Sequence, residues 1–249
     1  MDLERIFREE DMFPMRITSW AERPYGFLFY SESNKDSFDS NHAVIFRSRV
    51  MDLDEAVEDI VQFYSEKGIK PTIYQSISDD GYFAEKEDVL ARHGFKCWTE
   101  DQKYMVLSEA NTITPNQKIQ VERVRQWNDD YAAHIFLAAE EPWEIAVAQS
   151  VISRCDTLFF VAYYEGIPVG MTYGHLADGV CRVDYLLVSK KARSMGVGRA
   201  LICAFVEHCH AQRIETCYLW PDGDTAERIY HEAGFRPVAV KQAGRACMR

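Results

Sequence analysis

The segment that most constrains the fold is a strand, a glycine-containing turn and a helix in immediate succession. An apolar run over residues 183–188 precedes the sequence Arg-Ser-Met-Gly-Val-Gly-Arg at residues 193–199, and a second apolar run follows it. The first amides of a helix have no intrahelical acceptor, and the positive end of the helix dipole points into such a turn. Because Gly196 and Gly198 carry no side chain, a bulky anion can approach these amides. The segment predicts either a structural turn or a cradle for a pyrophosphate group.

Two widespread phosphate-binding motifs do not fit this turn. A Walker loop requires Gly-Lys-Ser/Thr after four intervening residues, and a dinucleotide-binding turn requires a third glycine with an acidic residue about 20 positions further on. The chain has neither pattern, and two cations, Arg193 and Arg199, bracket its glycines instead. A phosphate site here therefore belongs to a different class.

Further motifs follow the turn at fixed spacing. Residues 216–220 have a strand pattern, residues 221–224 predict a turn, and a helix pattern then ends at Gly234-Phe235. In this arrangement the chain resembles the GNAT superfamily of acyl-CoA-dependent N-acetyltransferases. Arg193, Gly196 and Gly198 match the family's R/Q-x-x-G-x-G/A turn. Ala226, Tyr230, Gly234 and Phe235 match its A-x-x-x-Y-x-x-x-G-F helix. Leu186, Leu187 and Val188 match the L-x-V end of the strand that precedes the turn.

The resemblance covers about residues 118–249 and implies an α+β fold with a GNAT-like mixed sheet flanked by helices. It implies acetyl-CoA (coenzyme A) as cosubstrate and transfer of the acetyl group to a primary amine of a small molecule or peptide. It also implies that the backbone of residues 186–188 holds the pantetheine arm and polarises the thioester oxygen. A non-catalytic acyl-CoA sensor is the alternative function. The residues expected to bind the cofactor are Leu186, Leu187, Val188, Arg193, Ser194, Met195, Gly196, Val197, Gly198 and Arg199.

The turn before the last helix departs from the family pattern. Family members often carry Asn there, whereas this chain has Gly223 between Asp222 and Asp224. We expect these two aspartates to cap the helix instead.

Asp184 is a candidate general base. It lies two residues before Leu186, so strand alternation predicts both side chains on one face, near the acceptor side of the thioester. A base, acting directly or through water, is needed because an amine with a solution pKa of about 10 is mostly protonated at neutral pH. The alternative is an ion pair between Asp184 and Arg182 or Arg193.

Tyr230 is the second candidate catalytic residue. It stands at the position of the family's tyrosine, and the resemblance implies that it protonates the departing thiolate. The alternative is a buried tyrosine that packs against the helix end at Gly234-Phe235.

Acceptor recognition is assigned to Glu140, Glu141 and Trp143, which lie between two predicted helices. Carboxylates attract an ammonium group, and an aromatic face adds cation–π attraction. These residues fit equally well as helix-cap and packing residues.

The first half of the chain has the same order of elements as the second. Two strand patterns precede a helix that Asp52 caps, and a further strand and helix end at Gly94-Phe95 before a last strand. This repetition predicts two tandem GNAT-like domains, of which only the C-terminal one carries the phosphate turn; an unrelated α+β accessory domain is the alternative. The expected boundaries are residues 1–107 for the first domain, 108–117 for a linker and 118–249 for the catalytic domain.

Charge restricts the partners. The formal net charge is −11, which argues against nucleic acid and anionic membranes and favours a cationic acceptor. No apolar run is long enough to span a bilayer, and the charged N-terminus does not resemble a secretory signal. A homodimer is compatible with the sequence.

The cysteines indicate a reducing compartment. There are seven of them, scattered singly without a C-x-x-C pair, which predicts free thiols and a cytoplasmic location. His208-Cys209-His210 is the one segment that suggests metal ligands. Because adjacent side chains on a helix point in different directions, we expect no metal there and no metal cofactor.

Overall fold

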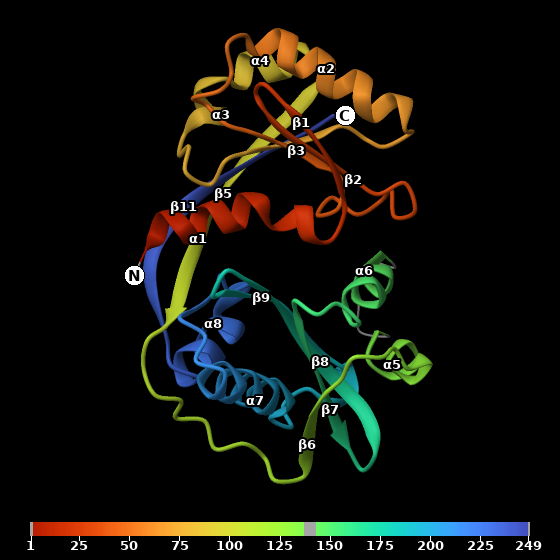
Figure 1. Cartoon of the computed structure of the whole chain (residues 1–249), viewed down its shortest axis with the longest axis vertical. Helices are drawn as coiled ribbons and strands as arrows, with labels where there is room; N and C mark the ends of the chain where they lie inside the picture. The colour runs from red at the N-terminus through yellow and green to blue at the C-terminus, as the bar shows by residue number, and fades with distance from the viewer. Residues whose placement is uncertain (1, 137–142, 249) are drawn as a thin grey trace. The chain divides into compact units, whose positions relative to one another are not determined.

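The computed structural model describes residues 2–136 and 143–248, which divide into two compact units. The C-terminal unit consists of Lys103–Ala239. The N-terminal unit consists of residues 2–102 together with residues 240–248. Figure 1 shows helices flanking a sheet in each unit, as the α+β prediction requires.

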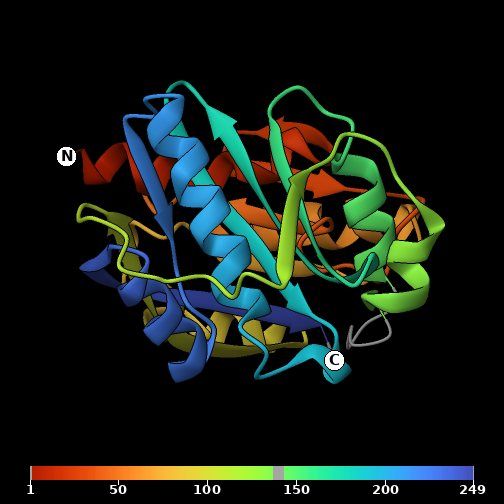
Figure 2. The same ribbon diagram turned by 90° about the horizontal axis from the view of Figure 1, so that it is seen from below.

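The C-terminal unit is built on a sheet with the strand order β6-β7-β8-β9-β10-β5-β11. Strands β6 to β9 form an antiparallel meander, and β10 runs parallel to β9. Helix α7 packs across β6 to β9 on one face (Figure 2). The elements are β6 (Ile119–Arg123), α5 (Asp129–His134), α6 (Trp143–Val151), β7 (Thr157–Tyr164), β8 (Ile167–Ala177), β9 (Val180–Val188), η3 (Lys190–Ala192), α7 (Val197–Ala211), β10 (Thr216–Leu219) and α8 (Gly223–Glu232), with parts of β5 (Phe95–Leu107) and β11 (Phe235–Met248).

The N-terminal unit repeats this layout with the strand order β1-β2-β3-β4-β11-β5. Two antiparallel pairings lead into the parallel pair β3 and β4, which α2 connects. The cap of α2 is as expected, because the Asp52 side chain accepts a hydrogen bond from Glu55 N–H. The elements are α1 (Leu3–Met12), η1 (Phe13–Arg16), β1 (Ser19–Arg23), β2 (Gly26–Tyr30), β3 (His42–Ile45), α2 (Leu53–Glu66), β4 (Thr72–Gln75), α3 (Tyr82–Glu85) and α4 (Glu87–Arg92).

The two longest strands each contribute to both units. Residues 95–102 of β5 belong to the N-terminal unit and its last five residues to the C-terminal unit; β11 begins in the C-terminal unit and ends in the N-terminal one. The sequence interpretation assigned residues 103–107 to the first domain and residues 240–248 to the second, so the compact units differ from those boundaries. Each unit therefore completes its sheet with a strand segment from the other half of the sequence.

Residues 108–118, which include the predicted linker, contain no helix or strand. They are nevertheless held against the C-terminal unit. Thr112 N–H donates to Glu232 O at 2.9 Å, and Glu109 forms an ion pair with Arg236. The segment is thus an ordered part of the C-terminal unit.

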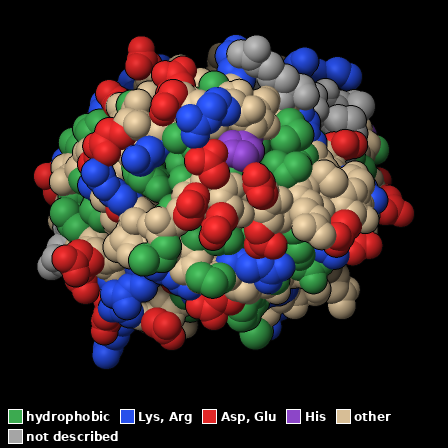
Figure 3. Space-filling model, turned by 90° about the horizontal axis from the view of Figure 1, so that it is seen from above, with side chains coloured by type: hydrophobic (Ala, Val, Ile, Leu, Met, Phe, Trp, Pro, Cys, Tyr) green, Lys and Arg blue, Asp and Glu red, His purple; other side chains and the backbone are tan. Residues whose placement is uncertain are grey.

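The charge on the surface and the hydrophobicity of the helices relate to the predicted partners. On the face shown in Figure 3, acidic side chains gather near the centre and Lys and Arg side chains are dispersed. No helix within residues 2–136 and 143–248 is both long enough and apolar enough to cross a membrane.

Candidate active site

The predicted phosphate turn connects β9 to α7. Gly196 is the N-cap residue of α7 and has a φ of +85°, a left-handed conformation that favours glycine. The side-chain amide of Asn116 donates a 2.9 Å hydrogen bond to the Met195 carbonyl oxygen. A glycine N-cap and a hydrogen bond from residues 108–118 thus fix the position of the first turn of α7.

The first amides of α7 are available to a ligand. In the described part of the chain, the backbone N–H groups of residues 196–199 have no backbone acceptor, and helical bonding begins with Ala200 N–H to Gly196 O at 3.0 Å. The helix has 15 residues, so its dipole adds a positive potential at this end. Helix N-termini with these features commonly bind anions.

A cavity of about 670 Å³ opens beside the turn, within the range of about 300–1,000 Å³ that is usual for small-molecule sites. A Cβ atom at Gly198 would lie 3.5 Å from Ile229 Cδ1 and 3.8 Å from Leu186 Cδ2. Any longer side chain at this position would therefore project into the cavity. The lining residues are Leu186, Leu187, Val188, Ala192, Arg193, Ser194, Gly196, Val197, Gly198, Arg199, Asp222, Thr225, Ala226, Arg228 and Ile229.

Strands β9 and β10 separate beside this cavity. They pair in parallel only where Thr216–Tyr218 of β10 faces Val180–Arg182 of β9, while on its other side β9 remains paired with β8 as far as Val188. Among the described residues, β9 beyond Arg182 has no strand partner on the β10 side. Strand alternation directs the N–H and C=O groups of Leu186 and Val188 away from β8, and these can hydrogen-bond an extended ligand as an added strand would.

Comparison with known proteins agrees with this geometry. A family model described as an acetyltransferase (GNAT) domain matches residues 120–247. The chain belongs to the GNAT acetyltransferase family. No curated protein is significantly similar to it in sequence.

Solved structures share the GNAT fold over nearly the whole chain. A GCN5-related N-acetyltransferase from Kribbella flavida is 16% identical, with a TM-score of 0.71 over 98% of this chain and 94% of that one. One from Sphaerobacter thermophilus is 15% identical, with a TM-score of 0.61 over 100% of this chain and 86% of that one. A conserved protein of unknown function from Staphylococcus epidermidis is 17% identical, with a TM-score of 0.64 over 95% and 96%. At these identities the likeness concerns the fold, and it confirms the predicted fold class.

The residues expected to bind the cofactor lie together in this GNAT domain. All of them line the cavity except Met195, which packs against the buried core beneath α7. The Arg199 guanidinium is held by the Glu232 carboxylate of α8, with nitrogen–oxygen distances of 2.5 and 2.8 Å. Arg193 is exposed, and among the described residues it forms no ion pair.

Helix α8 adds lining residues that the sequence did not assign to the cofactor site. Arg228 brings a third cation to the cavity, and Asp222 and Thr225 line it beside α8. Asp222 occupies the N-cap position, but its side chain makes no capping hydrogen bond, so the expected cap does not form there. The A-x-x-x-Y motif could have pointed to Arg228, since it lies two residues after the motif's alanine on the first turns of the same helix.

The β8–β9 pairing skips Asp184, so this residue forms a β-bulge. Its carboxylate contacts Arg182 and lies 3.5 Å from His175 Nε2, whereas Leu186 packs beneath α7 on the other face of the sheet. The prediction that Asp184 and Leu186 share a face is therefore wrong, because an extra residue in a strand breaks the two-residue alternation.

The environment of Asp184 favours the ion-pair interpretation. Burial raises the pKa of its carboxyl group, but the Arg182 charge and His175 outweigh burial and lower that pKa to about 2. A carboxylate with so low a pKa is a weak proton acceptor at neutral pH. Of the two arginines considered as partners, Arg182 is the one that pairs with it.

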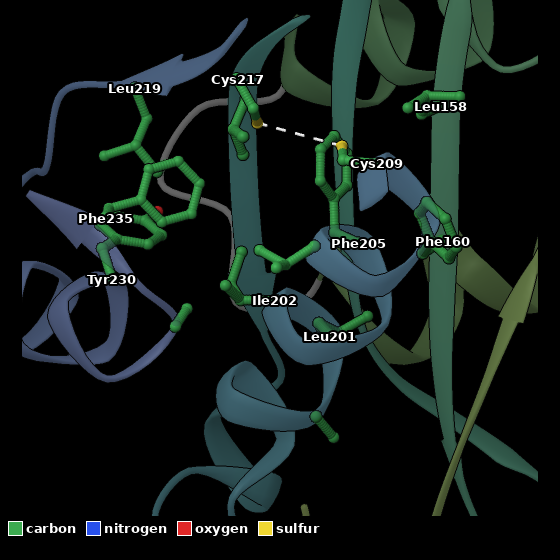
Figure 4. Close-up of a cluster of buried hydrophobic side chains, with 14 of the residues drawn as sticks. Leu158, Phe160, Leu201, Ile202, Phe205, Cys209, Cys217, Leu219, Tyr230 and Phe235 are labelled. Carbon is green, nitrogen blue, oxygen red and sulfur yellow. Dashed lines mark hydrogen bonds between the residues drawn. The ribbon is translucent and has the colours of Figure 1, made fainter. Parts of the chain in front are cut away.

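Tyr230 belongs to the buried core and does not line the cavity (Figure 4). Its ring packs edge-on against Phe235, with centroids 6.0 Å apart. Burial and the nearby Asp222 charge raise the pKa of Tyr230 to about 12. Its hydroxyl group is therefore protonated at neutral pH, as a proton donor must be.

The acceptor residues are only partly described. Glu140 and Glu141 lie outside the described residues, and Trp143 is the first residue of α6, half-buried. The next residue, Glu144, accepts a hydrogen bond from the Tyr185 hydroxyl group of β9. The sequence reasoning missed this carboxylate.

Tyr185 belongs to an aromatic cluster on the sheet face that also carries Asp184. Its ring stacks on Tyr173 at 5.6 Å, Tyr173 stacks on Phe159 at 5.3 Å, and His175 meets Tyr173 edge-on at 5.7 Å. This cluster lies on the opposite side of β9 from the core beneath α7. Phe159, Tyr173 and His175 are buried, and the Tyr185 ring is half-buried beside the carboxylates of Asp184 and Glu144; a carboxylate and an aromatic face are the groups that attract an ammonium group.

Proposed function

We propose that this protein transfers an acetyl group from acetyl-CoA to a primary amine of a small molecule or peptide. The observation that supports this most is a single cavity that joins the first amides of α7 to the edge of β9 at Leu186–Val188. The amides suit a pyrophosphate, and the strand edge suits the amide-bearing arm of a thioester carrier. Family membership alone supports an acyltransferase, and the cavity supports the choice of cosubstrate.

Acetyl-CoA, when bound, supplies the thioester. The amides of residues 196–199 and the side chains of Arg193 and Arg228 would hold its phosphates. The backbone N–H groups of Leu186 and Val188, which alternate with those directed at β8, would orient the pantetheine arm and donate to the thioester oxygen, where negative charge develops. A preorganised donor at such a position is worth about 3–4 kcal/mol in the barrier.

Proton removal from the amine requires a stronger base than Asp184. We assign this role to Glu144, whose carboxylate accepts a hydrogen bond from the hydroxyl group of Tyr185. Asp184 then has a positioning role. Its ion pair with Arg182 and its contact with His175 hold the β-bulge, which shifts the side-chain alternation of the residues that follow in β9. Tyr230 remains our proposed donor to the thiolate because it stands at the position of the family's tyrosine and is protonated at neutral pH; since it packs in the core and does not line the cavity, this role requires its hydroxyl group to reach the thiolate from there.

The seven free cysteines support a reducing, cytoplasmic setting for this reaction. The acidic net charge supports a cationic acceptor.

Thiol release from acetyl-CoA with a panel of primary amines tests the proposal. We expect release above the hydrolytic background for at least one small amine or peptide amine, together with acetylated product by mass spectrometry. Saturable binding of acetyl-CoA without release for any amine would instead support the acyl-CoA sensor.

A further inference from the structure

Three buried cysteines converge beneath α7, away from the cofactor cavity. Cys181 of β9 and Cys217 of β10 are direct partners in the parallel pairing of these strands, so their side chains lie on the same face of the sheet. Cys209, near the end of α7, covers that face. The three Sγ atoms lie within 4.8 Å of one another, and those of Cys209 and Cys217 are 4.0 Å apart (Figure 4).

This cluster cannot be recognised from the local spacing of residues in the sequence. The segment His208-Cys209-His210 contributes only Cys209, and neither histidine joins the cluster. The partners of Cys209 are 8 and 28 residues away, on two other elements. Only the packing of α7 on β9 and β10 brings the three thiols together.

Cysteine also serves as a small apolar core residue, but the arrangement here offers more than packing. Three sulfur ligands at about 2.3 Å from one pyramidal three-coordinate atom lie about 3.5 Å from one another, and the Cys209–Cys217 separation of 4.0 Å is already close to this. The sulfur atoms therefore already have nearly the spacing of a three-coordinate site.

Burial decides which ion fits. The exposed fractions of Cys181, Cys209 and Cys217 are 0%, 1% and 2%, within the apolar core of the unit. Three thiolates around Cu(I) carry a charge of −2 and around Zn(II) a charge of −1, and an uncompensated buried charge is strongly unfavourable. The C-terminal end of α7 is the negative end of its dipole and disfavours an anion further. A trivalent ion gives a neutral complex.

We propose that Cys181, Cys209 and Cys217 form a binding site for one trivalent thiophilic ion, with arsenite as the representative ligand. Arsenious acid, As(OH)₃, reacts with the three thiols to form As(SR)₃ and three molecules of water. Three As–S bonds replace three As–O bonds, each thiol proton leaves with a hydroxide, and no atom is oxidised or reduced. Every species is neutral, so no charge enters the core.

Entry requires only local opening. Cys209 lies in the last turn of α7, and Cys181 and Cys217 each lie one residue inside the start of their strands. Helix ends and adjoining loops open more readily than the core as a whole. Once bound, the ion cross-links α7 to β9 and β10. The proposal does not depend on acetyl-CoA or on turnover.

Native mass spectrometry and arsenic X-ray absorption on the reduced full-length protein test the site. With sodium arsenite we expect a single adduct, heavier by one arsenic atom less three hydrogens, whose arsenic has three sulfur neighbours and no oxygen. Absence of an adduct, or retained oxygen ligands, would overturn the proposal. This measurement needs no variant, so it decides the matter even if a cysteine substitution prevents folding.

Substitutions then identify the ligands. Loss of an outer-shell partner at a metal site weakens binding by about 10- to 100-fold. Cys209→Ser and Cys217→Ser each remove a direct ligand, so each should weaken arsenite binding by more than this. Cys155→Ser removes an exposed thiol outside the cluster and should leave the affinity unchanged. Equal affinity in the Cys209→Ser protein would show that arsenite binds elsewhere. Zn(II) is the charge control: binding to the same cysteines more tightly than arsenite would refute the assignment to a trivalent ion.

Discussion

Among individual residues, the two carboxylates near β9 have different environments and therefore different expected roles. Asp184 is held by Arg182 and His175, and its pKa falls to about 2. Glu144 is half-buried at the start of α6 and contacts Tyr185. We therefore expect Asp184 to stabilise the bulge of β9 and Glu144 to take the proton.

Substitution of each carboxylate should separate the two roles. Asp184→Asn removes the anion that faces buried Arg182, so we expect the free energy of unfolding to fall by about 3–5 kcal/mol. Glu144→Gln should leave stability within about 1 kcal/mol of the parent and lower kcat by about 10²- to 10⁴-fold. Chemical denaturation and steady-state kinetics on both variants measure this. A stable Asp184→Asn enzyme with lost kcat would return the role of base to Asp184.

The sequence predicted the cofactor turn from local signals but could not predict the face of Asp184. The pattern formed by Gly196, Gly198 and the neighbouring apolar runs lies within about 20 residues of chain. The structure has the turn and the helix that this local pattern indicates. The position of Asp184 depends on a β-bulge, which arises where β8 and β9 pair and leaves no mark in a two-residue alternation. Tyr185 and Glu144 come together through the same long-range packing.

For whole elements, a buried acid links α1 to the residues that follow β4, in addition to the buried side chains of Ile6 and Phe7. The Asp11 carboxylate accepts hydrogen bonds from the Ser76 hydroxyl group at 2.6 Å and from Ile77 N–H at 2.9 Å, just after β4. Burial, which outweighs these hydrogen bonds, raises the pKa of Asp11 from 3.8 to about 7. The folded protein thus holds this proton over a range in which the unfolded chain has lost it.

The stability of the N-terminal unit should therefore fall as the pH rises from about 4 to about 7. In this window the unfolded state binds fewer protons at Asp11 than the folded state, so the free energy of unfolding decreases with pH. Asp11→Asn keeps the acceptor for Ile77 N–H without the charge. We expect it to be more stable than the parent at pH 8, with a smaller difference at pH 5, by chemical denaturation. A variant less stable than the parent at pH 8 would show that the carboxylate is favourable when charged.

For the whole molecule, β5 and β11 make each half of the sequence dependent on the other. The buried residues Tyr104, Met105 and Val106 precede the predicted linker, yet they belong to the C-terminal unit. The alternating pattern of a strand indicates which residues are buried, but not which strand is its partner. The sequence therefore predicted two similar domains, and the sharing of β5 and β11 is known only from the structure.

A fragment of residues 110–249 tests this dependence. It retains the turn and every residue that lines the cavity, but it lacks the β5 segment that lies between β10 and β11. We expect it to be insoluble or to unfold without cooperativity, as followed by circular dichroism during heating. The full-length protein should show a cooperative transition, and so should a mixture of the fragment with residues 2–109 if the halves reassociate. A fragment that unfolds cooperatively alone would contradict the dependence.

The most direct measurement of the cofactor assignment is calorimetric titration of the full-length protein with coenzyme A. Gly198 gives the sharpest variants, because a Cβ there meets only ordinary contacts whereas Gly196 has the left-handed conformation and would be strained by substitution. We predict saturable binding of coenzyme A to the parent protein. Gly198→Glu should bind it at least about 100-fold more weakly, because its carboxylate would repel the phosphates, and Gly198→Ala should lose less affinity than Gly198→Glu. The melting temperature of each variant should show that the fold persists. No heat of binding to the folded parent, or undiminished affinity in Gly198→Glu, would contradict the account.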